Sequence, residues 1–217
     1  MMRSRFDEQL DMLNRKMIEM SSMCESLIDN ASRALVEGNL DLARHVIMDG
    51  VGIDQSERDI EGLCVKLLLQ QQPVAGDLRK ISAALKMVTD IERIGDQAED
   101  IAEIVPFLQG QNMENCELIQ KMAKATIEMV TQSIDAFVKK DTALAESVIE
   151  RDDIVDNFFL EMKHLLIRMI TENPKSGEYA LDLLMISKYF ERIGDHAVNI
   201  AKWVIYSVTG EWKGETR

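Results

Sequence analysis

The chain has 217 residues and a formal net charge of −13, so binding to the like-charged backbone of nucleic acids is disfavoured. Aromatic residues make up 5% of the sequence and prolines number three, which favours helices over a β-sandwich. The N-terminal residues include acids where a signal peptide needs an apolar run. The longest apolar stretches are far shorter than the roughly 20 residues of a membrane span. Three separated cysteines without a Cys-x-x-Cys pair indicate free thiols. We therefore expect a cytoplasmic protein with no direct membrane insertion.

Breaker residues divide the chain into six segments, each about 35 residues long. They lie at 38–39, 73–76, 106–110, 139–141, 174–177 and 210. Within the segments, apolar residues recur at helical spacing, as Leu10, Leu13 and Met17 do in the first. The pattern predicts six long helices, and the short loops predict antiparallel neighbours. A solenoid of helix pairs has a similar period, but residues 78–105 offer only Gly95 as a midway break, which favours single long helices.

The sequence also repeats itself. Residues 85–102 and 184–201 lie 99 positions apart and share nine of eighteen residues, including an unbroken Glu-Arg-Ile-Gly-Asp. Upstream, Val46-Ile47 followed by Asp54 matches Val148-Ile149 followed by Asp156, at an offset of 102. A duplicated unit of three helices explains both matches. We therefore predict an all-α fold of two tandem pseudosymmetric three-helix bundles, residues 1–110 and 111–217, built from six long antiparallel helices.

Acidic residues follow helical spacing in both copies of this unit. Glu92, Asp96 and Asp100 lie at i, i+4 and i+8, on a different side of the predicted helix from its apolar stripe, so their carboxylates should point outward. Two helices packed side by side would bring four carboxylates of each half together, and such a cluster needs a countercharge. The candidate ligands are Asp54, Glu57, Glu92, Asp96, Asp100, Asp152, Asp156, Glu191 and Asp195.

Two interpretations of these acids are open at this point. Oxygen-only ligands suit hard cations such as magnesium, calcium, manganese or ferric iron. A solvated acidic face, neutralised by Arg93, Arg192 or lysines of adjacent helices, is the alternative. Gly95 and Gly194 lie between the apolar and acidic stripes, where they predict either close helix contact or backbone access to a bound ion.

These motifs together resemble the PhoU family of bacterial phosphate-transport regulators, over essentially the whole chain. The residues that carry the resemblance are Val46-Ile47, Asp54, Gln72-Pro73-x-x-x-Asp77-Leu78-Arg79, Asp90-x-Glu92-Arg93-Ile94-Gly95-Asp96, Val148-Ile149, Asp152-x-x-x-Asp156 and Glu191-Arg192-Ile193-Gly194-Asp195. No single five-residue piece is decisive. The doubled Glu-Arg-Ile-Gly-Asp at this spacing in an all-helical chain is highly specific.

The resemblance implies two three-helix bundles whose Glu/Asp-x-x-x-Asp motifs bind metal, with multinuclear iron clusters in some family members. It implies a regulatory role: when phosphate is plentiful, the protein restrains the phosphate ABC transporter and the phosphate-starvation two-component system. The implied partners are the ATPase subunit of that transporter and the phosphate-sensing histidine kinase. Homodimers in the cytoplasm are the implied assembly.

The chain departs from the family pattern at two positions. The aspartate expected four residues before Asp54 is Gly50, and Tyr189 stands where the first copy has Asp90. The first-half site would therefore draw on Glu57, Asp96 and Asp100.

A different class of function is a metal-dependent hydrolase that uses the carboxylate clusters as two-metal sites. The number of acids in each half is what suggests it. The sequence contains neither a Ser-His-Asp motif nor a phosphate-cradling glycine loop, so the non-enzymatic regulator is the favoured interpretation.

Overall fold

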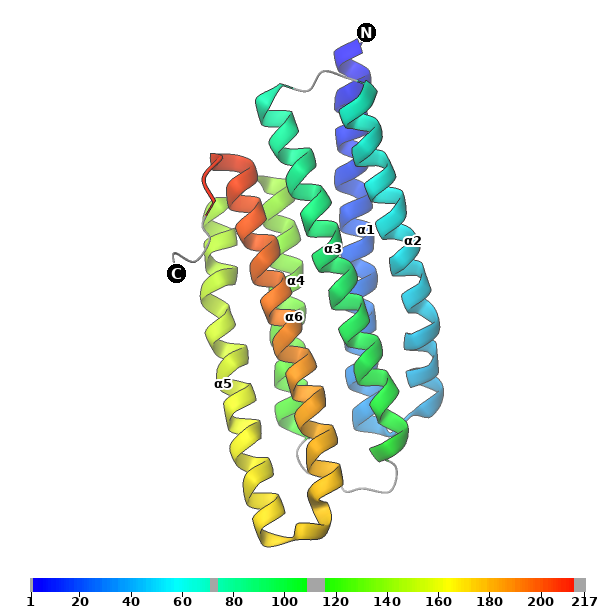
Figure 1. The fold of residues 1–217 in the computed structure, drawn as a ribbon, viewed down its shortest axis with the longest axis vertical. Helices are drawn as coiled ribbons and strands as arrows, with labels where there is room; N and C mark the ends of the chain where they lie inside the picture. The colour runs from blue at the N-terminus through cyan, green and yellow to red at the C-terminus, as the bar shows by residue number, and fades with distance from the viewer. Residues whose placement is uncertain (1, 71–73, 109–115, 213–217) are drawn as a thin grey trace.

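Six long helices account for almost all of the described chain in the computed structural model, which describes residues 2–70, 74–108 and 116–212 (Figure 1). They are α1 (Met2–Glu37), α2 (Leu40–Gln70), α3 (Ala75–Ile104), α4 (Cys116–Lys139), α5 (Thr142–Glu172) and α6 (Gly177–Thr209). Two short 3-10 helices, η1 (Val105–Leu108) and η2 (Pro174–Ser176), follow α3 and α5. The described residues contain no strand, so the predicted all-α fold of six helices is confirmed.

Local sequence explains where several of these helices begin and end. Asn39 caps α2, because its Oδ1 accepts a hydrogen bond of 3.0 Å from the backbone N–H of Leu42. Asp141 caps α5 in the same way, by accepting from the N–H of Leu144 at 3.0 Å. α6 ends at Thr209 and is followed by Gly210, whose φ of 80° lies in the left-handed region that glycine tolerates best.

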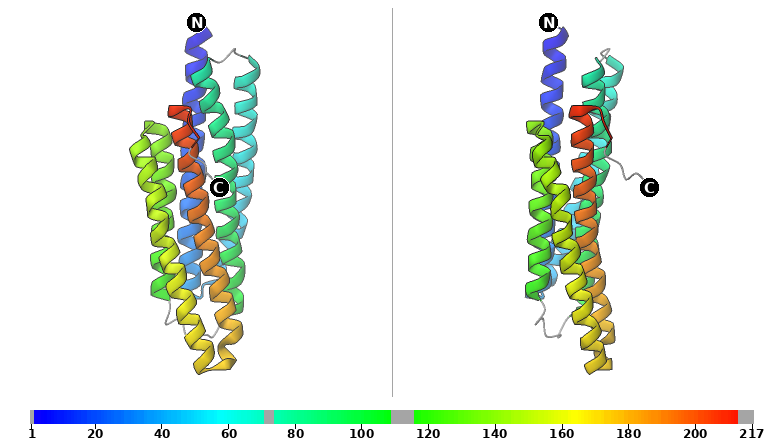
Figure 2. Two further views of the ribbon diagram at one scale, coloured as in Figure 1. Left: turned by 60° about the vertical axis from the view of Figure 1, so that its left-hand side comes forward. Right: turned by 90° about the vertical axis from the view of Figure 1, so that its left-hand side faces the viewer.

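The helices alternate in direction and form two bundles, α1–α3 and α4–α6 (Figure 1). α3 packs along α6 and α1 along α4, so the bundles lie side by side (Figure 2). Buried apolar side chains from all six helices belong to one continuous core. The boundary predicted between residues 110 and 111 lies outside the described residues, as do the breakers at 73 and 109–110.

Two cysteines of the described residues lie in the core of the first bundle. Cys24 and Cys64 are buried free thiols, whereas the side chain of Cys116 lies outside the described part. Cys24 donates a hydrogen bond of 3.3 Å from Sγ to the backbone oxygen of Ile91, which joins α1 to α3. Across residues 2–70, 74–108 and 116–212, we find no helix that is both long and apolar enough to cross a bilayer.

Candidate metal centre

Three carboxylates from two helices meet at the seam between α2 and α3. Asp54 lies on α2, while Glu92 and Asp96 lie one turn apart on α3. One oxygen of each carboxylate lies within 4.8 Å of the other two, and all three residues are partly buried. Among the described residues, no other three acidic, histidine or cysteine side chains come together this closely. We call these residues the first-half trio.

The local sequence explains why the trio converges. Glu92 and Asp96 are four residues apart and therefore share one face of α3. Gly95 lets α2 approach this face closely, because a Cβ at that position would lie 3.1 Å from Cγ2 of Ile53. The close approach places Asp54, the residue after Ile53, beside the acids of α3. Of the two roles that the sequence suggested for Gly95, close helix contact is the one that the structure shows.

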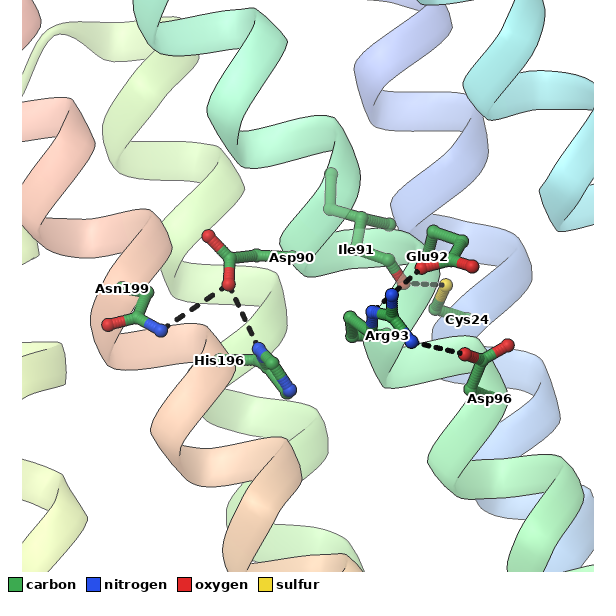
Figure 3. A network of polar contacts seen from close by, with 8 residues as sticks. All are labelled: Cys24, Asp90, Ile91, Glu92, Arg93, Asp96, His196 and Asn199. Carbon is green, nitrogen blue, oxygen red and sulfur yellow. Dashed lines mark hydrogen bonds and ion pairs between the residues drawn. The ribbon is translucent and has the colours of Figure 1, made fainter.

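Arg93 lies between the two α3 carboxylates of the trio (Figure 3). Its Nε is 3.4 Å from Glu92 Oε2, and its Nη1 is 3.4 Å from Asp96 Oδ2. Glu92 Oε2 is nevertheless buried without accepting a hydrogen bond. The Arg93 side chain is 56% exposed, so rotation into solvent would free both carboxylates. The pairing expected for a plain acidic face is thus formed, but it leaves one buried oxygen without a donor.

Burial and mutual repulsion act on the same carboxylates. Burial raises the pKa of Glu92, and the charge of Asp96 raises it further. Burial also raises the pKa of Asp96, although the Arg93 guanidinium opposes this and Asp54 adds to it. A cation that enters the seam would therefore stabilise the charged forms of these side chains.

The second bundle repeats the arrangement with different details. Asp152 and Asp156 lie on α5 and Glu191 and Asp195 on α6, at a seam that corresponds to that between α2 and α3. Burial and the nearby Asp156 and Asp195 raise the pKa of Asp152 to about 6. Asp152 Oδ1 is buried without a hydrogen-bond donor and lies 3.1 Å from where a Cβ on Gly194 would be.

In the second half, Lys188 supplies the positive charge that pairs with the acids, whereas Arg93 supplies it in the first half. The Nζ of Lys188 pairs with Oε2 of Glu191 and lies 5.5 Å from the ring centroid of Phe159. The repeat places Thr89 and Glu57 at the equivalent positions of the first half. The Thr89 side chain hydrogen-bonds Glu57, so a hydroxyl replaces the ammonium group there.

Glu57 and Asp100 lie beside the first-half trio rather than within it. Glu57 interacts electrostatically with Asp54, and burial raises its pKa. Asp100 lines a cavity of about 450 Å³ at the contact of α3 with α6, together with Arg93 and Arg192. A role for either residue as a metal ligand stays a prediction.

The acids are less exposed than an outward-pointing stripe predicts. The side chains of Glu92 and Glu191 are 17% and 15% exposed, and that of Asp96 is 37% exposed. Asp156 and Asp195 are exposed, so neither cluster is sealed inside the core. The acids lie at helix seams, where two helices contribute ligands and solvent still has access.

A polar contact between the bundles was beyond the reach of sequence reasoning. Asp90 Oδ1 on α3 lies 2.9 Å from His196 Nδ1 on α6 and accepts a 3.4 Å hydrogen bond from Asn199 Nδ2 (Figure 3). The repeat aligns Asp90 with Tyr189, and helical periodicity carries no information about partners on another bundle. The only feature of the sequence that could have indicated this contact was a charged residue, Asp90, on the side of α3 that faces away from the trio.

The residues at the two seams fit a hard cation. They offer carboxylate oxygens, which Mg²⁺, Ca²⁺ and Mn²⁺ prefer. Each seam also contains a buried carboxylate oxygen without a donor, Glu92 Oε2 in the first half and Asp152 Oδ1 in the second. The residues that would hold the ion are Asp54, Glu92 and Asp96 in one half and Asp152, Asp156, Glu191 and Asp195 in the other.

Comparisons with known proteins agree with this architecture. The PhoU domain matches the chain twice, over residues 17–105 and 119–204. The phosphate-specific transport system accessory protein PhoU homolog of Aquifex aeolicus is 37% identical over 205 residues, which cover 94% of this chain and 93% of that protein. Its namesake in Rhizobium meliloti is 32% identical over 209 residues, covering 95% and 88%.

Solved structures show the same fold. The crystal structure of PhoU from Pseudomonas aeruginosa superposes with a TM-score of 0.90 at 33% identity, covering 95% of this chain and all of that one. The phosphate transport system regulatory protein PhoU from Streptococcus pneumoniae gives a TM-score of 0.91 at 25% identity over 97% of this chain. The doubled domain match, the near full-length relatives and the shared six-helix architecture show that this chain belongs to the PhoU family.

Proposed function

We propose that this protein is a non-enzymatic regulator of phosphate uptake and of phosphate-starvation signalling, and that it acts in the cytoplasm with metal bound at its carboxylate clusters. In this role it restrains the phosphate ABC transporter and the associated two-component system when phosphate is plentiful. The observation that carries the proposal is the match of both halves to the PhoU domain. Relatives that cover nearly the whole chain are named as accessory proteins of the phosphate-specific transport system.

A bound metal would supply fixed positive charge at each seam. In the first half, Asp54 of α2 and Glu92 and Asp96 of α3 would hold the cation through carboxylate oxygens. The Arg93 side chain would move aside, which its exposure allows. A cation held by these residues would reduce the repulsion among the acids of α2 and α3 and so change the charge of the surface that a partner meets.

The charge of the protein suits basic partner surfaces. A net charge of −13 draws a positively charged surface toward the acidic seams and increases the rate of encounter. The partners we propose are the ATPase subunit of the phosphate ABC transporter and the phosphate-sensing histidine kinase. A homodimer is the expected assembly of the regulator itself.

Binding to these two partners tests the proposal. The purified protein, immobilised through a terminal tag, is presented with the transporter ATPase subunit and with the cytoplasmic part of the kinase, at high and at low phosphate. We expect saturable binding to at least one of them. Binding to neither under either condition would overturn the proposal.

A loss-of-function experiment in the native host tests the direction of regulation. Deleting the gene should switch on a phosphate-starvation reporter in phosphate-rich medium, and the wild-type gene should restore repression. A variant with Glu92→Gln and Asp96→Asn tests whether the first-half trio takes part. A reporter that stays repressed after the deletion would exclude the proposed restraining role.

A further inference from the structure

We propose that Glu99 is the fourth carboxylate ligand of the first-half metal centre, filling the place that Asp152 holds in the second half. The inference rests on the metal binding proposed above. It concerns a residue that the repeat does not indicate, because the position equivalent to Glu99 in α6 is Val198.

The carboxylate of Glu99 occupies the space that a side chain at position 50 would need. A Cβ on Gly50 would lie 1.8 Å from Glu99 Oε1, 2.2 Å from Glu99 Cδ and 2.8 Å from Glu99 Oε2. An aspartate at position 50 and this conformation of Glu99 therefore exclude one another. The missing side chain on α2 is what makes room for the carboxylate of α3.

The second half shows the reciprocal arrangement. The repeat aligns Gly50 with Asp152 and Glu99 with Val198, which is buried at 7% exposure. One half thus combines glycine with glutamate and the other combines aspartate with valine. Each half keeps one carboxylate in this space but takes it from the opposite helix of the pair.

Helix geometry places Glu99 in line with the trio. It follows Glu92 by seven residues and Asp96 by three, so it lies on the same face of α3, one turn beyond Asp96. Gly50 precedes Asp54 by one turn on α2, which runs antiparallel to α3 (Figure 1). The step from Asp96 to Glu99 on α3 and the step from Asp54 to Gly50 on α2 therefore lead toward the same end of the seam. Glu99 extends the cluster of carboxylates in that direction.

A buried carboxylate oxygen of the trio supplies an independent sign that a cation belongs at this seam. Glu92 Oε2 is buried and accepts no hydrogen bond. A buried acceptor without a donor is costly, and a cation with its bound water would satisfy it. With four carboxylates, the first-half centre has the donors that a hard divalent cation such as Mn²⁺ requires.

Mn²⁺ binding measured by calorimetry and by electron paramagnetic resonance tests the role of Glu99. All proteins carry Asp156→Asn and Glu191→Gln, so that binding in the second half is removed. In this background we compare the unaltered first half with Glu99→Gln, with Gly50→Asp plus Glu99→Val, and with Glu92→Gln plus Asp96→Asn. Circular dichroism and thermal unfolding verify that each variant is folded.

We expect Glu99→Gln to weaken Mn²⁺ binding by about tenfold or more, because it removes one charged ligand. The Gly50→Asp, Glu99→Val protein copies the second-half arrangement and should recover an affinity within about threefold of the starting protein. Glu92→Gln with Asp96→Asn should abolish binding. Unchanged affinity in Glu99→Gln, alongside loss in the Glu92 and Asp96 variant, would overturn the role of Glu99 and leave the metal centre standing. No Mn²⁺ binding by the starting protein would overturn the metal centre itself.

Discussion

The two halves of the chain share a backbone plan but neutralise their acids by different means. In the first half, Arg93 reaches Glu92 and Asp96 from an exposed position on the same helix. In the second half, Lys188 pairs with Glu191 beside the ring of Phe159. Duplication thus preserves the position of the carboxylates at the seam more strictly than the cation that accompanies them.

This difference suggests that the two centres bind metal with unequal strength. The ligand atoms of the first-half trio lie within 4.8 Å of one another, whereas no three acids among the described residues of the second half come this close. An ammonium group already beside Glu191 also competes with an incoming cation. We therefore expect the first half to bind a divalent ion more tightly than the second. Substitutions at equivalent positions of the two halves test which contributions to stability and metal affinity the halves share.

The largest effect should come from the core, which the halves share. Phe190 and Ile91 occupy equivalent positions of the repeat, and both are fully buried. Phe190→Ala should lower the free energy of unfolding by about 3–5 kcal/mol and Ile91→Ala by about 2–5 kcal/mol. Because the core is continuous, urea denaturation should show one transition for each variant. Two separate transitions would mean that the bundles fold independently.

Exchanging the residues beside the acids should change metal affinity by a smaller amount. Lys188→Thr removes the ammonium group from Glu191 and should strengthen Mn²⁺ binding in the second half by about 1 kcal/mol, or about fivefold. The reciprocal Thr89→Lys should weaken binding in the first half to a similar extent. Calorimetric titration measures both constants. Identical affinities before and after the exchange would show that these residues do not cause the difference between the halves.

The contact between the bundles should contribute less still. Asp90→Asn keeps the size of the side chain but removes the charge that faces His196 Nδ1 at 2.9 Å. We expect a loss of about 0.5–1.5 kcal/mol in the free energy of unfolding. Tyr189→Phe, at the equivalent position of the repeat, is the matched control and should have a smaller effect. An equal or larger loss in the control would contradict a specific role for Asp90.

The smallest effect is the pH dependence of metal-free protein, because solvent screens the charges of carboxyl groups that are only partly buried. Burial, followed by repulsion from Asp96 and Asp54, raises the pKa of Glu99 to about 7, and the pKa of Asp152 rises to about 6. Such groups stabilise the fold below their unfolded pKa near 4, and this contribution is lost as the pH rises through the folded value. In chelator-treated protein the melting temperature should therefore fall slightly between about pH 4.5 and 7.

Glu99→Gln combined with Asp152→Asn should flatten this fall, since neither amide titrates. Mn²⁺ should act in the opposite direction, because it binds the deprotonated carboxylates and its affinity rises with pH. A melting temperature of the metal-free protein that rises over the same interval would contradict the assignment to these two carboxyl groups.

The sequence predicted the helices well because their ends depend on local chemistry. Asn39 and Asp141 cap the helices that follow them, and both stand at predicted breaks. The repeat also predicted which acids share a seam, because i, i+4 spacing fixes the face of a helix. Asp54, Glu92 and Asp96 were all among the candidates, and the structure brings them together.

The rest of the site depends on contacts between helices, which periodicity does not encode. In the sequence, Gly50 indicates a lost ligand, and the sequence-based prediction draws on Glu57, Asp96 and Asp100 instead. The structure instead places the carboxylate of Glu99 against Gly50. The sequence does contain this difference, because Gly50 and Glu99 of the first half align with Asp152 and Val198 of the second. It can be interpreted only when α2 and α3 are known to face each other at that turn.

Anomalous diffraction from crystals of the full chain grown with Mn²⁺ would test the metal centre most directly. We predict a peak at the seam of α2 and α3, within coordination distance of Asp54, Glu92 and Asp96, with the Arg93 side chain turned away. A weaker peak should lie at the seam of α5 and α6. The absence of a peak at saturating Mn²⁺, with Arg93 still between Glu92 and Asp96, would show that these acids form an arginine-neutralised surface instead of a metal centre.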